Sequence, residues 1–312
     1  MTSNPIDIKC GGNYLAAQFA IAALFAMIAL TLSTNVLAKE PSIPPGLDPG
    51  GVAVAVFGPG IDYTAKGISD HLARDGEGNP IGFDFVDDDG LPFEPITEFN
   101  NTKMRPGTTL ASIIVREAPK ARLAAFKLNP TEGEKLGRAA AMAGQSPVRI
   151  VLIPWTGEVA ETWEIFSKAA QHFDKLLFVA AAGDENRDLD AKPNFPANLK
   201  LANVIVVTAT ESDGRATPGA NSGAKTVDIA VTGSQVLGLA ADNTQKNYAG
   251  SAIAAARVAA LAARILAANT ALKGSQLKQK IIEIAKMAST KNMPVISGWI
   301  EDPAKVDIAQ FK

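Results

Sequence analysis

Short apolar runs alternate along the chain with longer stretches in which apolar residues recur every three or four positions. The run at 51–57 is apolar throughout and is bounded by Gly58-Pro59-Gly60, which predicts a buried strand followed by a turn. Further strands are predicted at 122–126, 149–153, 176–182, 203–208 and 226–230, and helices at 108–118, 132–143 and 159–173. Strands that alternate with helices predict a parallel sheet with helices on both faces.

The last third of the chain is predicted to be helical. Residues 250–268 are rich in alanine, with Ile253, Val258, Leu261 and Ile265 as the larger apolar side chains. Small side chains all round a helix allow close packing on several sides, so we expect this helix at the centre of the fold. A second helix is predicted at 275–288. The fold class that follows is α/β, with three αβα layers around a mostly parallel central sheet.

The first forty residues have a different character. Residues 15–38 carry no charge, Lys9 precedes them and Lys39-Glu40 follows, and the small or short side chains Val36 and Ala38 fit a signal peptidase site. We interpret 1–38 as a secretory signal cut after Ala38, which predicts a periplasmic or secreted protein. The alternative is an uncleaved membrane anchor, because the apolar run is long enough to span a bilayer. Residues 39–50 are rich in proline and glycine and read as a linker to a domain at 51–312.

Composition narrows the range of partners. The 312 residues are 47% hydrophobic and 20% charged with a formal net charge of −2, and no run of five or more lysines and arginines occurs. Nucleic acid is therefore not expected as a partner, and a membrane is expected only if the N-terminal segment stays uncleaved. Cys10 is the only cysteine and precedes the predicted cleavage point, so the mature chain would have neither a disulfide nor a thiolate metal site.

Several segments, taken in order, resemble the subtilisin-like serine proteases. Residues 54–62 resemble the strand and turn that carry the catalytic aspartate of that family, and 105–128 resemble the stretch that opens with its histidine. Residues 176–188 resemble the strand that ends in its oxyanion-hole asparagine. Residues 248–266 resemble its nucleophile motif and the helix that follows. With 82–94, 193–215 and 226–238, the resemblance covers about 51–270, and it implies the subtilisin-like three-layer fold.

The same resemblance identifies four positions where the reactive groups should be. The aspartate position is Gly58, the histidine position is Pro106, the serine position is Ala252, and the oxyanion asparagine position is Asp184. Peptide hydrolysis by such a triad needs a nucleophile, a proton acceptor and a group that orients the acceptor. Glycine, proline and alanine supply none of these, and an ionised Asp184 would repel a developing oxyanion. We therefore predict no catalytic residues at these positions.

Substitute groups for the triad are few. Ser251 adjoins Ala252 and is a candidate for a displaced nucleophile, but we favour a role in capping the following helix. The two histidines, His71 and His172, lie in amphipathic, surface-type helical contexts outside any nucleophile motif. Asp62 and Asp184 could together serve an enzyme of another type, although their spacing gives no support beyond proximity by analogy.

The substrate groove is also predicted to differ from that of the family. The family lays substrate backbone against a strand that ends in Ser-Leu-Gly, and the equivalent here is 153–157, Ile-Pro-Trp-Thr-Gly. Pro154 removes a backbone donor. Trp155 either fills the groove and weakens peptide binding or points into the core, and the sequence leaves both open.

Two acidic runs raise the question of calcium, which prefers several carboxylate and carbonyl oxygens as ligands. The first holds Asp84, Asp87, Asp88 and Asp89, and the second holds Asp184, Glu185, Asp188 and Asp190. We favour solvated turns over metal sites for both, so no cofactor is predicted.

Two functions are weighed on this basis. The first is an exported, non-catalytic protein of the subtilisin-like fold that binds, scaffolds or regulates a protein or peptide partner, which the sequence does not identify. The second is a serine endopeptidase of the subtilisin family, which requires a serine and a histidine that the motifs do not supply.

Overall fold

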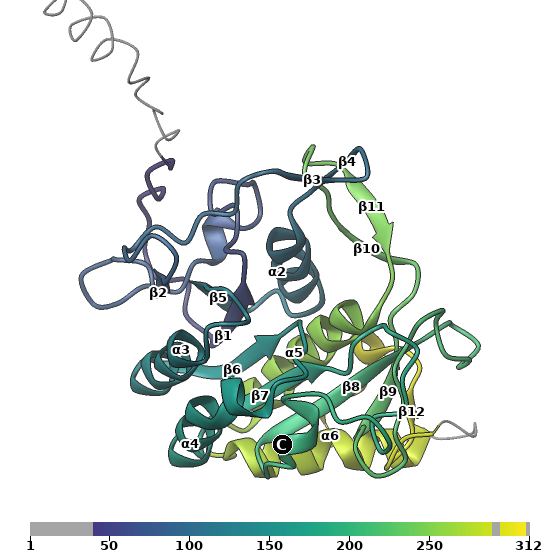
Figure 1. Cartoon of the computed structure of the whole chain (residues 1–312). Coiled ribbons are helices and arrows are strands. Elements are labelled where there is room, and N and C mark those ends of the chain that lie inside the picture. The colour runs from purple at the N-terminus through teal and green to yellow at the C-terminus, as the bar shows by residue number, and fades with distance from the viewer. Residues whose placement is uncertain (1–39, 289–293, 310–312) are drawn as a thin grey trace, which may run out of the picture. The chain divides into compact units, whose positions relative to one another are not determined.

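A parallel sheet of eight strands runs through the computed structural model, which describes residues 40–288 and 294–309 (Figure 1). The strand order is β12-β9-β8-β7-β6-β1-β5-β2, and every pairing within the sheet is parallel. The strands are β1 (Val52–Gly58), β2 (Gly82–Asp84), β5 (Ala121–Lys127), β6 (Val148–Ile153), β7 (Leu177–Ala181), β8 (Val204–Thr210), β9 (Ile229–Thr232) and β12 (Trp299–Ile300). The predicted signal at 1–38 lies outside the described residues.

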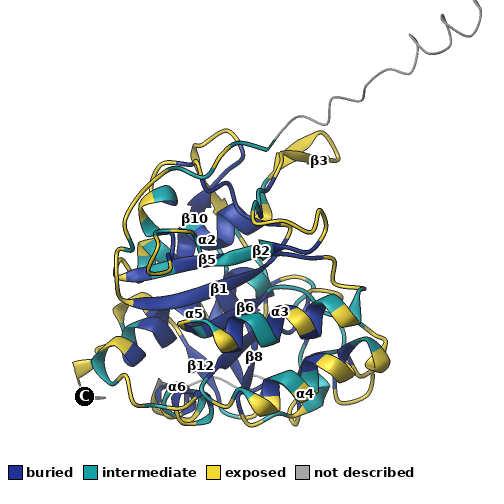
Figure 2. Cartoon of the chain, turned by 90° about the vertical axis from the view of Figure 1, so that its left-hand side faces the viewer, coloured by how far each residue is buried: buried dark blue, intermediate teal, exposed yellow. Residues whose placement is uncertain are grey.

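Helices cover both faces of the sheet and bury two apolar clusters against it. Helices α2 (Pro106–Glu117), α5 (Ser251–Ala268) and α6 (Gly274–Ala288) contribute to one cluster, and α3 (Gly133–Gln145) and α4 (Glu164–His172) to the other. Strand β1 contributes to both because its side chains alternate: Val54 and Val56 face the first cluster, Ala55 and Phe57 the second. The predicted α/β fold with three layers is confirmed (Figure 2).

Helix α5 occupies the centre that its alanine-rich sequence predicts. It contacts strands β1 and β5–β9 as well as α2 and α6, and most of its residues are buried. Among the described residues, α5 is the one helix that is long and apolar enough to cross a bilayer, but 78% of that window is buried inside the domain. Its hydrophobicity therefore serves core packing.

Some predicted boundaries were wrong. The strand expected at 226–230 begins only at Ile229, because the Val227 N–H closes a turn onto Gly223 O at 3.0 Å and the Asp228 carboxylate accepts the Val206 N–H at 2.8 Å. The helix expected at 159–173 starts as the 3-10 turn η2 (Ala160–Trp163) before α4. Two ribbons were not predicted: β3 (Thr97–Phe99) with β4 (Thr102–Met104), and β10 (Val236–Leu239) with β11 (Gln245–Tyr248).

Residues 41–50 form neither helix nor strand but are bonded to the domain. Tyr63 Oη donates to Pro41 O at 2.6 Å, and Arg74 Nη2 donates to Pro44 O at 2.6 Å. Asp48 accepts the Arg74 N–H at 2.7 Å and pairs with Arg122. The segment expected as a linker is thus part of the folded unit that begins at Pro41.

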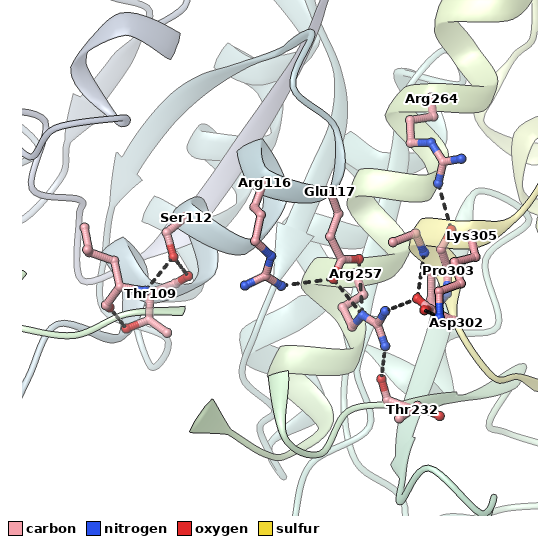
Figure 3. A network of polar contacts seen from close by, with 12 residues as sticks. Thr109, Ser112, Arg116, Glu117, Thr232, Arg257, Arg264, Asp302, Pro303 and Lys305 are labelled. Atoms are coloured by element: carbon pink, nitrogen blue, oxygen red, sulfur yellow. Dashed lines mark hydrogen bonds and ion pairs between the residues drawn. The ribbon is translucent and has the colours of Figure 1, made fainter. Parts of the chain in front are cut away.

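A buried arginine ties the C-terminal segment to the two main helices (Figure 3). Arg257 of α5 pairs with Glu117 of α2 at 2.9 Å and with Asp302, and its Nη1 donates to Thr232 O at 2.7 Å. Arg264, two turns further along α5, donates to the carbonyls of Pro303 and Val306. Charged hydrogen bonds in a site of low exposure fix these elements relative to one another.

Candidate functional site

The four positions singled out by the sequence lie on elements that meet at the carboxyl edge of the sheet. Gly58 is the last residue of β1, and Asp184 follows the end of β7. Pro106 is the first residue of α2, and Ala252 is the second residue of α5. In open parallel sheets, ligands bind at the edge where the strands end.

Three of the four positions surround one cavity of about 270 Å³. Its walls include Met104, Pro106, Leu110, Asp184, Tyr248 and Ala252. Gly58 does not line this cavity. The nearest atom to a Cβ built on Gly58 is Cζ3 of Trp155, at 4.0 Å. The structure therefore brings together the positions expected to carry the histidine, the serine and the oxyanion asparagine.

Asp184 is bonded to the start of α5. Both carboxylate oxygens accept the Ser251 N–H at 3.0 Å, and Oδ2 accepts the Ser251 hydroxyl at 2.9 Å. The N-terminus of a helix leaves backbone N–H groups unpaired and carries partial positive charge, so a carboxylate there is stabilising. Asp184 thus occupies the N-terminus of the helix that would carry the nucleophile.

Ser251 does not cap α5 as the sequence suggested. The cap residue is Gly250, at φ +129°, and no side chain of the cap position bonds to the helix. The Ser251 hydroxyl is buried, donates to Asp184 and accepts the Gly183 N–H at 3.0 Å. The capping function predicted for Ser251 is performed from outside the helix by Asp184, a role that the sequence position of Asp184 does not reveal.

Helix α2 begins in a similar way, with a carboxylate that sequence reasoning missed. Glu94 is 1% exposed and accepts the N–H groups of Gly107 at 2.8 Å and Thr108 at 2.7 Å, as well as the Thr108 hydroxyl. Burial raises the pKa of Glu94, against the effect of these hydrogen bonds and of Arg105. Glu94 lies only ten residues after Asp84 in the acidic loop, and no motif distinguishes it from its neighbours.

Asp62 is held apart from Asp184. Its carboxylate pairs with Arg105 and accepts the N–H and hydroxyl of Thr64 at 3.0 and 2.6 Å. Asp62 is buried and does not line the cavity. The geometry gives no support to a site built from Asp62 and Asp184 together.

Both histidines lie at the opposite edge of the sheet. His71 ends the 3-10 turn η1 (Ser69–His71), and its Nδ1 lies 2.9 Å from the carbonyl oxygen of Ala121, the first residue of β5. His172 ends α4, shortly before β7 begins, is exposed, and packs edge-on against Phe173. The chain has no other histidine, so no imidazole reaches the cavity.

Trp155 is half-buried and packs against the cluster under α3 and α4. Its indole N–H is buried without a hydrogen-bond partner, and it does not line the cavity. Of the two alternatives left open by the sequence, this position agrees with core packing beside Gly58.

Carboxylates in both acidic runs are bonded to nearby side chains of the protein. Lys127 Nζ lies 2.6 Å from Asp84 Oδ2 and 3.0 Å from Asp87 Oδ2, with the lysine side chain 11% exposed. The Lys127 ammonium therefore pairs with both carboxylates. Glu40 lies close to them, and Glu40, Asp84 and Asp87 each offer a carboxylate oxygen within 4.8 Å of the others. In the second run, Glu185 accepts from the Asn221 amide, and Asp190 accepts from the Thr226 hydroxyl at 2.7 Å.

Solved structures of subtilisin-like proteins have the same fold as this chain. A cold adapted subtilisin-like serine proteinase matches with a TM-score of 0.67 and 19% identity, over 85% of this chain and 93% of that one. A lanthipeptide protease matches with a TM-score of 0.67 and 17% identity, over 81% and 87%. The A-subunit of the AB5 toxin from E. coli matches with a TM-score of 0.67 and 21% identity, over 85% and 94%.

No curated protein matches the sequence significantly. The model of the subtilase family, by contrast, matches residues 50–299, from the start of β1 to β12. That range contains the parallel sheet except for Ile300, the last residue of β12, and all four positions that surround or adjoin the cavity. The chain therefore belongs to the subtilase family.

Proposed function

We propose that this protein is a non-catalytic subtilase that binds, scaffolds or regulates a protein or peptide partner. The support comes from the residues at the carboxyl edge of the sheet, where Gly58, Pro106 and Ala252 carry no group that can attack a carbonyl or move a proton. The fold persists without these groups, so its function would depend on binding.

The observation that carries the proposal is the position of the two histidines. A serine hydroxyl becomes an effective nucleophile only when a base within hydrogen-bond reach accepts its proton. His71 is bonded to a carbonyl at the amino edge of the sheet, and His172 is exposed beside α4. The one serine beside the expected nucleophile position, Ser251, has its hydroxyl engaged by Asp184 and Gly183.

Asp184 adds a second argument. An oxyanion is stabilised by donors aimed at it, and a carboxylate in that place offers acceptors only. The Asp184 carboxylate is also bonded to the first N–H group of α5. It would thus block, by charge and by occupancy, the helix terminus that could have stabilised a tetrahedral intermediate.

The test uses the purified full-length chain with casein and with a fluorophosphonate probe that labels activated serines. We expect neither cleavage nor labelling, in contrast to an active subtilase assayed in parallel. The matched control is Ser251→Ala. Labelling or cleavage that disappears in this variant would overturn the proposal in favour of a serine endopeptidase with a displaced nucleophile.

We further propose that the protein acts in the periplasm or outside the cell. The support is the charge-free segment at 15–38, which has the form of a secretory signal. Mass spectrometry of the protein from fractionated cells should find a mature N-terminus at Lys39 outside the cytoplasm. A chain retaining residues 1–38 in the membrane fraction would instead support an anchor.

A further inference from the structure

Two small β-ribbons lie near α2 in Figure 1. Both contribute residues to the cavity at the starts of α2 and α5. Strands β3 and β4 form one ribbon, and β10 and β11 form the other, and neither ribbon joins the main sheet. Residues of β4 and of β11 both line the cavity. A strand in a two-stranded ribbon pairs on one side only, so each ribbon has open edges.

The register of the first ribbon shows which backbone groups point outward from β4. Asn100 and Asn101 form a two-residue turn, both with positive φ, so Phe99 and Thr102 are a hydrogen-bonded pair. Hydrogen-bonded and non-hydrogen-bonded pairs alternate along an antiparallel ribbon, which makes Glu98 and Lys103 a non-hydrogen-bonded pair. The N–H and C=O groups of Lys103 therefore point away from β3, and those of Glu98 point away from β4.

The same reasoning applies to β11. The Ala240 N–H donates to Thr244 O at 2.8 Å, so this pair is hydrogen-bonded and the Leu237–Asn247 pair is not. Leu239 confirms this alternation of hydrogen-bonded and non-hydrogen-bonded pairs. Its N–H and C=O groups point out of the ribbon and bond with Ser112 and Thr109 of α2. The N–H and C=O groups of Asn247 therefore point out of the free edge of β11.

The space between these edges favours one kind of occupant. Lys103 and Asn247 lie in the wall of the cavity, and Met104, Leu110 and Ile253 give it apolar surface. Lys103 is exposed. Among the described residues Lys246 forms an ion pair with Asp242, and this pair holds Lys246 weakly because both side chains are more than half exposed. The one carboxylate in the wall, Asp184, is bonded to α5.

We propose that this cavity receives an extended, acidic peptide segment of a partner protein. The segment would pair as a strand with the free edge of β4, place a large apolar side chain in the cavity, and bring carboxylates to Lys103 and Lys246. The inference rests on the proposed function, since it names the partner of a binding protein. The surface is separate from 153–157, the family's substrate strand, none of whose residues line the cavity.

The test measures binding of a fluorescent peptide, Glu-Glu-Val-Phe-Val-Glu-Glu, to the full-length chain by fluorescence anisotropy. We expect saturable binding. A version with Lys in place of Glu, and a version with N-methylated backbone, should each bind about tenfold more weakly, the loss expected from one or two hydrogen bonds or charge contacts. The N-methylated peptide keeps every side chain, so its loss reports backbone pairing.

Two proline variants locate the edge. Lys103→Pro removes the outward N–H of β4 without removing a bond within the ribbon, and should weaken binding about tenfold. Because Lys103→Pro also removes the Lys103 charge, it is compared with Lys103→Gln, which removes that charge, keeps the N–H and should weaken binding less. Glu98→Pro makes the same backbone change on the far edge of the ribbon and should leave binding within about twofold. Absence of saturable binding, equal effects of the two proline variants, or tight binding of the N-methylated peptide would each overturn the inference.

Mass spectrometry of the incubated peptide separates this inference from the proposed function. Intact peptide without binding would overturn the docking site alone and leave the non-catalytic assignment unchanged. Cleaved peptide would overturn the proposed function, whether or not the proline variants affect binding.

Discussion

The carboxylate of Asp184 accepts both the N–H and the hydroxyl of Ser251, and so joins the loop after β7 to the start of the central helix. The resemblance to the family places an oxyanion-hole asparagine at the position of Asp184. The Asp184 carboxylate is bonded instead to Ser251, the first residue of α5, and so contributes to the stability of the helix start.

Removing this carboxylate should destabilise the fold. Asp184→Ala leaves the Ser251 N–H and the buried Ser251 hydroxyl without their acceptor. We expect a loss of about 1–2 kcal/mol in the free energy of unfolding, as for loss of a helix cap. Urea denaturation followed by circular dichroism measures this, with Glu98→Ala, an exposed glutamate on the β3–β4 ribbon, as the matched control. Equal stability of the two variants would show that Asp184 has no capping role.

Installing a serine alone should not create a nucleophile. Ala252→Ser places a hydroxyl in the cavity wall, but His71 and His172 lie at the other edge of the sheet. We expect no fluorophosphonate labelling of this variant, because no base can take its proton. The double variant Ala252→Ser with Pro106→His places an imidazole in the wall of the same cavity, and should label measurably. Labelling of the single variant would mean that an unrecognised base is present.

The fold could be predicted from the sequence because its signals are local and repeated. Apolar strands such as 51–57 read as strands covered on both faces, and the alanine-rich stretch at 250–268 reads as a central helix. The two ribbons could not be predicted in this way, because β3, β4 and β11 are mostly exposed and have no apolar alternation. The start of β9 could not be predicted either, because it depends on the hydrogen bond from the Val206 N–H to the Asp228 carboxylate, which joins distant segments.

The sequence predicted only those residues of the candidate site that belong to recognisable family motifs. Pro106, Ala252 and Asp184 were placed by resemblance, and they surround one cavity. The contacts that these groups make run between distant segments of the fold, and spacing in the sequence does not encode them. Glu94 could not be singled out, because a buried carboxylate at a helix start and an exposed one in a loop look alike in sequence.

Glu94 should make stability depend on pH. Burial raises its pKa above the ordinary value of 4.5, so the folded chain binds this proton more tightly than the unfolded chain does. The stabilisation from that proton is complete below 4.5 and is lost as the pH rises through the raised pKa. In Glu94→Gln the group no longer titrates. The wild type should therefore lose stability relative to Glu94→Gln as the pH rises above 4.5, the ordinary pKa of the carboxyl group. The measured quantity is the difference between the two free energies of unfolding. If the free energies of unfolding of the two proteins changed in parallel with pH, the raised pKa of Glu94 would be contradicted.

The Arg257 network gives a prediction about how the C-terminal segment is held. Arg257→Met leaves Glu117, whose side chain is 6% exposed, with only Arg116, and leaves Asp302 without its arginine partner. Breaking a buried ion pair from one side costs about 3–5 kcal/mol, because the remaining charge stays buried. Arg264→Met is the matched control, since Arg264 donates only to the carbonyls of Pro303 and Val306 and strands no carboxylate.

Urea denaturation at pH 7 should therefore show a larger loss for Arg257→Met than for Arg264→Met. Adding Glu117→Leu to Arg257→Met should recover part of the loss, because the double change removes the stranded charge together with its partner. The recovery distinguishes an electrostatic cost from a packing cost, since a cavity left by the arginine would persist in the double variant. Equal losses for the two single variants would mean that the ion pairs of Arg257 add nothing to its packing.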